Sequence, residues 1–479
     1  MTIGTIEKTD VVVIGGGLAG LTAAYQLNKK GIGVRVLESS SRTGGVVSST
    51  TVDDFELDLG PNSLVLTPAL EAWIKELNLD AARLDASVSS RNRFLVRNKT
   101  MFALSPHPVK LLKSPYLSWG AKGRILTERF RGCGTGTGRP DAGGTAAADG
   151  TAVSGFGEAD DESVASFMTR RFGKEVSEAI ADPIFSGIYA GDISRLSVNE
   201  ALPRLAQWER EYGSLTKGVL REKKAMKGGR YIINFAGGME RLTKALAAPL
   251  EGAIYTQASV VQIGAGPEGY RVVYRRGEET QILESKYLIY AAPAYSLPSI
   301  PWFDELKETA SAISYAPVRT LHLAVRRDGL DLPDGFGFLV PSREHLSVLG
   351  CIFTSAIFPS KAPDGFALLT LMLGGAHRAE DLLKDGDKLQ ETALNELKEI
   401  LHIQSPVRVL HEQTWTKAIP QKNKGYGRIK QAFGAFEQTH PGCFFVGNAV
   451  SGVSVGDTME YAAGIAGGIS GGDLPDGRR

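Results

Sequence analysis

The sequence contains only 3 cysteines in 479 residues, and none of them stands in a C-x-x-C pair. Its 7 histidines are also scattered, without the H-x-H or H-E-x-x-H spacing of zinc sites. We therefore expect neither a disulfide framework nor a metal centre, and the low cysteine content favours a reducing compartment. The formal net charge of +1 produces no overall field that would attract nucleic acid, so no nucleic-acid partner is expected.

Long apolar runs are also absent, because none reaches the roughly 18 residues that a helix needs to cross a bilayer. The first residues, MTIGTIEKTD, lack the basic and then apolar order of a secretory signal. These features predict a cytoplasmic protein. The length, with 43% hydrophobic and 22% charged residues, predicts two or three packed domains.

A strand, a glycine loop, a helix and a second strand follow one another near the N-terminus. Val11–Ile14 is typical of a buried strand, and helical periodicity begins at Leu21. A second apolar strand, Val34–Leu37, ends at Glu38, which is placed to bind a ribose. The G-x-G-x-x-G pattern indicates a dinucleotide site, although a glycine-rich turn is the alternative and the pattern does not separate NAD from FAD. The loop residues are Gly15, Gly16, Gly17, Leu18, Ala19 and Gly20.

Two motifs beyond this loop narrow the choice of cofactor. Arg42, Gly44 and Gly45 complete an E-x3-R-x-G-G pattern that begins at Glu38, and FELDLGPNS ends at Ser63. Together they resemble the flavin amine oxidase superfamily, and the resemblance implies FAD. The cysteine that binds flavin covalently in some members has no counterpart, so we expect non-covalent FAD.

The resemblance continues in two later segments, YIINFAGGM with the strands up to YLIYAAP, and CFFVGN with GVSVGD. It places the following further residues at the cofactor: Ser39, Arg42, Gly45, Val46, Gly60, Pro61, Asn62, Ser63, Val260, Trp415, Gly447, Asn448, Val453, Ser454 and Val455.

The expected fold is α/β, with a Rossmann-like FAD-binding domain, an α+β substrate domain containing a mixed sheet, and a helical membrane-associating domain. The FAD-binding domain is assigned to residues 1–88, 230–297 and 436–479. The substrate domain is assigned to 89–105 and 298–435, and the helical domain to 106–229. Within the helical domain, residues 132–157 contain 9 glycines and predict a disordered loop.

A basic stretch from Ser89 to Arg131 contains 10 Lys or Arg residues and one acid, Glu128. Its basic side chains alternate with aromatic and aliphatic ones such as Trp119 and Leu126. A helix of this composition suits a membrane interface, and a solvated charged face is the alternative. We therefore expect peripheral membrane association, at an organelle membrane if the source is eukaryotic.

A block around residues 161–198 is the most specific part of the sequence. DESVASF, ADPIFSGIYAGD and RLSV occur there in this order, and the block resembles the protoporphyrinogen oxidase family. The resemblance implies oxidation of protoporphyrinogen IX to protoporphyrin IX by O2, with FAD accepting hydride and three H2O2 formed per six electrons. Hydride transfer to a flavin needs orientation more than an acid or a base, so no catalytic side chain is assigned.

The family likeness also implies a slot for the flat substrate. Arg93 is expected to bind a propionate, and Leu339 and Phe353 are expected to form apolar and aromatic walls. Membership of the basic stretch is the alternative for Arg93, and ordinary core packing is the alternative for the other two. Coproporphyrinogen III as substrate, another flavin oxidase such as an amine oxidase or carotenoid desaturase, a non-catalytic flavin or porphyrin carrier, and a homodimer all remain open.

Overall fold

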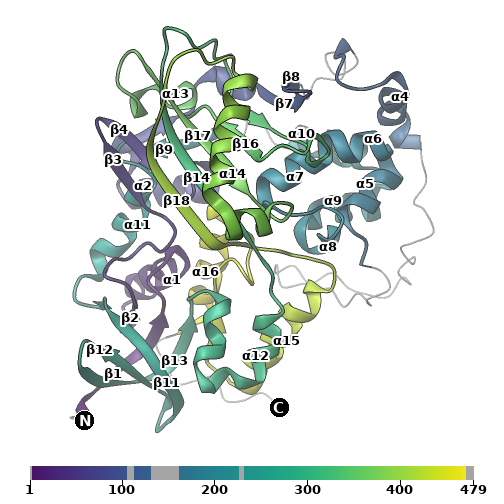
Figure 1. Ribbon diagram of the computed structural model, residues 1–479. Helices are drawn as coiled ribbons and strands as arrows, with labels where there is room; N and C mark the ends of the chain where they lie inside the picture. The colour runs from purple at the N-terminus through teal and green to yellow at the C-terminus, as the bar shows by residue number, and fades with distance from the viewer. Residues whose placement is uncertain (1–2, 105–112, 131–160, 226–230, 471–479) are drawn as a thin grey trace. The chain divides into compact units, whose positions relative to one another are not determined.

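The computed structural model describes residues 3–104, 113–130, 161–225 and 231–470 (Figure 1). By its internal contacts the chain forms two units. The first contains Met1–Ala86, Arg230–Ser314 and Ala432–Arg479, and the second contains Ser87–Gly229 and Tyr315–Gln431. The glycine-rich stretch 132–157 lies outside the described residues. Residues 298–314, which we assigned to the substrate domain, belong to the first unit, and the helices after residue 113 share the second unit with a mixed sheet.

The first unit is built on a seven-stranded sheet with the order β10-β2-β1-β13-β12-β11, and β19 pairs with β13. Four neighbouring pairs are parallel, namely β10 with β2, β2 with β1, β1 with β13, and β13 with β19. The bounds are β1 Ile3–Ile14, β2 Val34–Leu37, β10 Ile254–Tyr255, β11 Ala258–Gly266, β12 Gly269–Arg276, β13 Glu279–Tyr290 and β19 Cys443–Phe445. The Rossmann-like α/β fold is thereby confirmed, and β1 begins earlier than the predicted Val11.

Helices cover this sheet because their apolar side chains complete its core. α1 (Leu18–Lys29) packs against α16 (Val455–Gly468) and α11 (Glu240–Ala247). Leu21 and Leu27 of α1 are fully buried beside Val11 and Val36 of the sheet. Lys30 Nζ donates hydrogen bonds to the carbonyl oxygens of Ala466 and Gly467 at 2.8 and 2.7 Å, where α16 ends. A cation there also interacts favourably with the helix dipole.

The remaining elements of the first unit are short. β3 (Ser49–Val52) and β4 (Phe55–Asp58) form a hairpin, and β5 (Leu64–Leu66), β9 (Tyr231–Phe235) and β6 (Arg83–Asp85) form a small sheet. The helices here are α2 (Pro68–Glu76) and α12 (Lys307–Ser311). α15 (Tyr426–Thr439) contains the boundary between the two units.

The second unit contains a seven-stranded sheet with the order β18-β14-β17-β16-β15-β7-β8. Neighbours are antiparallel except β15 and β7, which run parallel, so the expected mixed sheet is present. The bounds are β7 Arg93–Arg97, β8 Thr100–Leu104, β14 Tyr315–Arg326, β15 Gly337–Leu339, β16 Val348–Ile352, β17 Phe366–Gly374 and β18 Val407–Pro420. α14 (Ala379–Ile400) packs its apolar stripe against β14 and β17.

The basic stretch contains a hairpin, in the part that we assigned to the domain with the mixed sheet, and a helical part after it. Its first part is a hairpin, because Asn98 and Lys99 both take positive φ angles, 50° and 58°, and turn β7 back into β8. Leu95 is buried, and the Arg97 guanidinium donates to the Tyr116 carbonyl oxygen at 2.8 Å. The helical part is α4 (Trp119–Thr127), followed by the short 3-10 helix η3 (Glu128–Phe130). Local alternation of apolar and basic residues did not separate a hairpin from a helix.

The other helices of the second unit form a group that includes α4 and η3. Their bounds are α5 Val164–Phe172, α6 Lys174–Val176, α7 Asp182–Tyr189, α8 Val198–Ala201, α9 Pro203–Tyr212 and α10 Leu215–Ala225. α5 begins inside the DESVASF motif, and the Ser163 side chain accepts a hydrogen bond from the Ser166 N–H at its start. None of the helices in the described part of the chain is long and apolar enough to cross a membrane.

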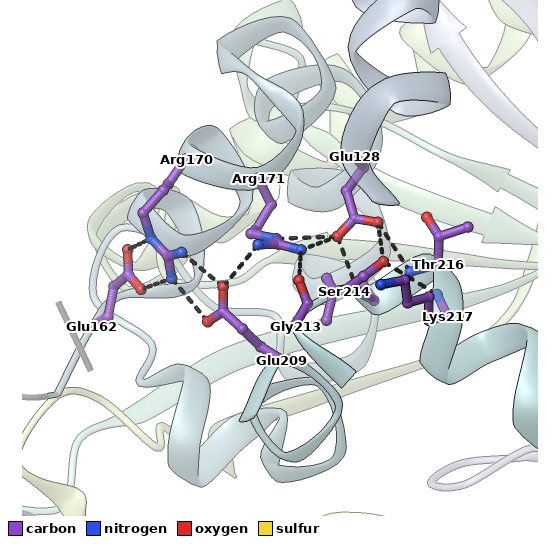
Figure 2. Close-up of polar contacts among 10 residues, drawn as sticks. Glu128, Glu162, Arg170, Arg171, Glu209, Gly213, Ser214, Thr216 and Lys217 are labelled. Carbon is purple, nitrogen blue, oxygen red and sulfur yellow. Dashed lines mark hydrogen bonds and ion pairs between the residues drawn. The ribbon is translucent and has the colours of Figure 1, made fainter. Parts of the chain in front are cut away.

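A chain of alternating charges holds these helices together (Figure 2). Arg170 of α5 binds Glu162 and Glu209, each with a shortest distance of 2.7 Å. Arg171 binds Glu209 at 3.3 Å and also pairs with Glu128. Arg171, Glu128 and Glu209 are 1%, 0% and 3% exposed. We call these five side chains the Arg170–Arg171 network.

Glu128 forms the other end of this network, at the start of α10. Its carboxylate accepts hydrogen bonds from the Leu215 and Thr216 N–H groups at 3.0 and 3.2 Å and from Ser214 Oγ at 2.7 Å. Burial opposes ionisation of Glu128, but the hydrogen bonds from Thr216, Ser214 and Arg171 outweigh it and lower the pKa to about 2. Glu128 therefore caps α10 as an anion and joins η3 to it.

Candidate cofactor and substrate sites

The carboxyl ends of the parallel strands in the first unit meet at one edge of the sheet. In the strand register Ile14 lies opposite both Leu37 and Tyr290, and Tyr290 lies opposite Phe445. The three segments predicted to bind the cofactor therefore leave the sheet at the same edge. Ligands of open α/β sheets bind outside such carboxyl ends.

Three of the four glycines in the first loop are needed for different reasons. Gly15 has φ +106°, and a Cβ there would lie 2.8 Å from the Ala292 nitrogen. A Cβ on Gly20 would lie 1.9 Å from the Gly15 oxygen, so α1 packs on β1 through this glycine. A Cβ on Gly17, in contrast, would have Gly45 Cα at 3.9 Å as its nearest neighbour in the described chain. Gly17 therefore leaves open space in front of α1.

The start of α1 faces this space without a side-chain cap from any described residue. The N–H groups of its first turn, including those of Leu18 and Ala19, are suited to bind a phosphate. The loop at Gly44 and Gly45 lies beside them, because the Gly44 N–H donates to the Gly16 oxygen at 2.8 Å. Arg42 stabilises this second loop by donating to the Gly45 oxygen at 2.7 Å. The space, the free helix start and the two glycine loops fit a dinucleotide pyrophosphate.

Glu38 lies directly after β2 and is held in place by backbone groups. Its two carboxylate oxygens accept hydrogen bonds from the Gly16 N–H at 2.7 Å and the Ser40 N–H at 2.8 Å. Each oxygen keeps further acceptor capacity for ribose hydroxyls. The Glu38 carbonyl accepts from Ala258 at 2.8 Å, which brings Val260, two residues along β11, to the same region. Ser39 is exposed beside Glu38.

The loop from Gly60 to Ser63 packs on the second glycine loop. A Cβ on Gly60 would lie 1.9 Å from the Val46 oxygen, so only glycine permits this approach. The Val46 side chain is 50% exposed, and a flavin beside it would cover apolar surface. Pro61, Asn62 and Ser63 are half-exposed along the same loop.

The C-terminal segment turns at Gly447, which has φ +114°. The following residues, Asn448 and Val453, are half-exposed, and Ser454 caps α16 by accepting a hydrogen bond from the Asp457 N–H at 3.0 Å. Val455 is the first residue of α16. All the predicted cofactor residues therefore lie in the first unit except Trp415, which lies on β18 in the second, opposite Val318.

Two buried polar residues of the first unit were missed by the sequence analysis. Asp58 is 5% exposed and Asn234 is 0% exposed, and the Asn234 amide donates to the Asp58 carboxylate and to the Asn62 carbonyl, both at 2.7 Å. Asp58 belongs to FELDLGPNS and Asn234 to YIINFAGGM, and a polar residue in each apolar strand was the available signal. A buried polar group of this kind needs a partner.

The predicted substrate residues lie in the mixed sheet of the second unit. Arg93 begins β7 and is exposed, and its guanidinium lies 4.9 Å from the ring centre of Phe336. The Phe336 oxygen accepts a hydrogen bond from the Phe353 N–H at 2.9 Å. Phe353 itself is 0% exposed and packs on Phe94, with ring centres 6.4 Å apart. Arg93 and Phe353 are thus connected through Phe336, but the Phe353 side chain has no exposed surface.

Leu339 connects this sheet to α7. It lies opposite Leu95 in the register of β15 and β7, and a Cβ on Gly187 of α7 would approach its side chain to 2.8 Å. The start of α7 is held by Asp182, whose carboxylate accepts a hydrogen bond from the Ser342 N–H at 2.6 Å. Burial of Asp182 raises the pKa of its carboxyl, and the Ser342 N–H opposes that change. Leu339 is half-exposed, so part of its side chain is available to a ligand.

Known proteins resemble this chain along most of its length. The family model described as flavin containing amine oxidoreductase matches residues 18–464. The mitochondrial protoporphyrinogen oxidase of Nicotiana tabacum is 27% identical over 95% of this chain and 94% of its own. The coproporphyrinogen III oxidase of Bacillus subtilis (strain 168) is 25% identical over 95% and 96%.

Solved structures show the same fold. A protein from Exiguobacterium sp. 255-15, named as a candidate protoporphyrinogen oxidase, has a TM-score of 0.76 at 20% identity over 96% of this chain and 98% of its own. Putrescine oxidase has a TM-score of 0.68 at 16% identity over 97% and 99%. The family match covers nearly the whole chain, beginning inside the first glycine loop, at Leu18, and ending inside α16. The chain therefore belongs to the flavin containing amine oxidoreductase family and is an FAD-dependent oxidoreductase.

Proposed function

We propose that the chain oxidises protoporphyrinogen IX to protoporphyrin IX in tetrapyrrole biosynthesis. The observation that carries this proposal is the likeness to protoporphyrinogen oxidases along 95% of the chain, with 27% and 29% identity to the Nicotiana and Arabidopsis proteins. Three two-electron steps reduce three O2 to three H2O2, and bound FAD supplies the hydride acceptor. The six hydrogens lost by the substrate balance the six in the peroxide.

The protein's own contribution is binding and orientation. The Gly15–Gly20 loop, Glu38 and the loop at Gly45 hold the dinucleotide part of FAD through backbone groups and one carboxylate. Arg93 offers an exposed guanidinium to a substrate propionate, and the Phe336 ring supports its orientation. Leu339 provides apolar contact for the macrocycle, and Phe353 supports Phe336 from the core. No step here requires a side-chain acid or base.

We also propose that FAD is bound without a covalent bond. Cys351 and Cys443 are both buried, at 1% and 0% exposure, and burial raises the pKa of each thiol, which disfavours the nucleophilic thiolate. Acid precipitation should therefore release all of the flavin into the supernatant. Yellow colour retained in the washed precipitate would contradict this proposal.

An aerobic assay with two substrates tests the activity. Protoporphyrin fluorescence should increase with O2 uptake when the purified holoprotein receives protoporphyrinogen IX, at a rate well above autoxidation. Coproporphyrinogen III is the second candidate because the Bacillus subtilis relative carries that name. Faster turnover of coproporphyrinogen III would select it. Oxidation of amines alone would indicate an amine oxidase, and FAD binding without turnover of any of them would indicate a carrier.

We further propose that the second unit associates with a membrane surface. Three helices of this unit each carry a strongly exposed large apolar side chain, Trp119 on α4 at 80%, Phe130 on η3 at 74% and Leu220 on α10 at 55%. η3 contacts both α4 and α10, and the Glu128 hydrogen bonds join η3 to α10 (Figure 2). Exposed basic residues accompany them, namely Arg124, Arg129, Lys217 and Arg221. Apolar side chains surrounded by basic ones suit an anionic interface.

Vesicle binding tests this surface. Co-sedimentation with vesicles should increase with their anionic lipid content and decrease with salt, because surface charge is screened over a Debye length. Trp119→Ser should weaken it, whereas Val88→Ser should not, although Val88 on η2 (Val88–Arg91) is 78% exposed. An equal loss of vesicle binding in both variants would contradict a specific membrane surface. Vesicle binding that does not depend on lipid charge or salt would contradict it as well.

A further inference from the structure

Asp58 is the centre of a buried joint between two segments that are far apart in the sequence. Its Oδ1 accepts hydrogen bonds from Ser49 Oγ and from the Met239 N–H, both at 2.7 Å. Its Oδ2 accepts the amide of Asn234 at 2.7 Å. The carboxylate therefore joins the β3–β4 hairpin to β9 and to the start of α11, 181 residues away along the chain.

Asn234 extends this joint to a loop of the FAD site. Its second amide hydrogen is donated to the Asn62 carbonyl at 2.7 Å, and its own oxygen accepts the Phe235 N–H at 2.5 Å. All three polar bonds are made by a side chain with 0% exposure. A buried amide with every bond satisfied holds its partners in one arrangement, because any displacement leaves a buried polar group unpaired.

The loop that Asn234 holds contacts the second glycine loop, which in turn contacts the first. Gly60 packs on the Val46 oxygen, and Gly45 lies beside Gly17, where a Cβ on Gly45 would be 3.2 Å from the Gly17 Cα. Gly44 approaches α11 as well, since a Cβ there would lie 3.0 Å from Thr243 Oγ1. A displacement of the 60–63 loop would therefore reach the pyrophosphate region through backbone contacts, without any flexible side chain between.

We propose that Asn234, anchored by Asp58, is a positioning residue that sets the shape of the FAD cradle through the Asn62 carbonyl. It acts through the loop and need not touch FAD. This inference rests on the FAD assignment alone, and its test does not use porphyrinogen turnover. Its failure can therefore be told apart from a failure of the proposed substrate.

The test uses a reciprocal exchange that separates the two bonds of the Asn234 amide. Asn234→Asp alone places two carboxylates together and removes the donor to Asn62, so both the melting temperature and FAD retention should fall. Adding Asp58→Asn supplies an amide that can donate to the carboxylate at position 234, while its oxygen still accepts from Ser49 and Met239. The exchange therefore restores the joint but not the hydrogen bond to the Asn62 carbonyl.

Two quantities are measured on holoprotein, the melting temperature and the rate at which free FAD fluorescence appears after dilution. We expect the double variant to recover most of the melting temperature while its FAD release stays about tenfold faster than wild type or more, as the loss of one buried hydrogen bond implies. Tyr270→Phe is the matched control. It removes a hydroxyl that donates to the His440 and Pro441 oxygens at 3.0 and 2.8 Å in the same unit, away from the glycine loops, and should leave FAD release within about twofold.

Recovery of FAD retention together with the melting temperature would overturn the proposal, because Asn234 would then stabilise the fold only. If Asn234→Asp alone gives no folded protein, the double variant decides by itself. FAD release within twofold of wild type in the double variant would show that the Asn62 carbonyl does not need its donor.

Discussion

Each unit contains a buried polar cluster with carboxylates, and the two clusters differ in the groups that compensate the buried negative charge. In the first unit one carboxylate, Asp58, is satisfied by neutral donors, namely an amide, a hydroxyl and a backbone N–H. In the second unit the Arg170–Arg171 network alternates three carboxylates with two guanidinium groups. The first cluster holds loops of the proposed FAD site, and the second holds helices of the proposed membrane surface.

The difference matters because buried charges are costly to separate. Neutral donors around one carboxylate can be exchanged with moderate loss, whereas removing one member of an alternating charge chain leaves its neighbours buried and uncompensated. A site whose shape must be accurate therefore uses short hydrogen bonds to backbone groups. A group of helices that must stay together can use long side chains that span the gaps between them.

The largest predicted effect comes from breaking the charge chain in the middle. Arg171→Met should lower the free energy of unfolding by about 3–5 kcal/mol, because Glu128 and Glu209 lose a buried partner. Arg326→Met is the control, since Arg326 is 62% exposed and solvent screens its pair with Asp328, so the free energy of unfolding should stay close to that of wild type. Urea unfolding monitored by circular dichroism measures both. If Arg171→Met lowers the free energy of unfolding by less than about 1 kcal/mol, the charged cluster is not the costlier of the two clusters to break.

Acid should weaken the second cluster through Glu128. Its folded pKa of about 2 lies below the usual value of 4.5, so the stabilisation is fully present above about pH 4.5 and is lost as the pH falls toward 2. The shift corresponds to roughly 3 kcal/mol. The stability difference between wild type and Glu128→Gln should therefore shrink over this range. A difference that stays constant from pH 6 to pH 3 would show that Glu128 ionisation is not responsible.

A smaller effect is expected where an arginine is exposed and binds a ligand. Arg93→Ala should raise KM for the porphyrinogen about tenfold, or about 1.4 kcal/mol, because a propionate loses a charged hydrogen-bond partner. Arg93→Lys should recover part of this loss, since it keeps charge without the planar fork. Flavin content should not change. Unaltered KM and kcat would show that Arg93 does not bind the substrate and is only a surface residue of the basic stretch. Arg91 would then be the next candidate for binding the propionate.

The smallest effect concerns a strained backbone conformation at the end of α7. Ala190 ends α7 with a left-handed conformation, φ 48° and ψ 28°, and its oxygen accepts the Ala376 N–H at 2.7 Å. Ala190→Gly should relieve the strain and raise the unfolding free energy by about 0.5 kcal/mol. Differential scanning calorimetry would detect the higher melting temperature. Ala201→Gly in α8 is the control and should be destabilising, because that alanine is helical.

The dinucleotide part of the fold was predictable because its signals are local. Val11–Ile14, the glycine loop and Val34–Leu37 are neighbours in the sequence and in the sheet, and the strand, helix and strand follow in the predicted order. The family likeness extended this prediction to the segments at Gly60 and Gly447. Residue roles at these positions stay predictions.

The two polar clusters were not predictable for the opposite reason. Asn234 lies 176 residues from Asp58, and Arg171 lies 43 residues from Glu128, so each pairing exists only once the register is formed. Glu128 stood in the sequence as one acid in a basic stretch, which suggested solvent or lipid as its surroundings. Its burial depends on α10, a helix that begins 87 residues later.

The packing of α1 against α16 has a consequence for how the protein is made. Lys30 meets the carbonyl of Ala466, 436 residues further along the chain. At the usual ribosomal speeds, roughly 20–90 s separate the synthesis of these two residues. During that time the apolar face of α1 cannot pack against α16, and the first unit of the nascent chain stays incompletely folded. Chaperone binding to the emerging polypeptide and the timing of FAD incorporation are thus linked to the synthesis of α16.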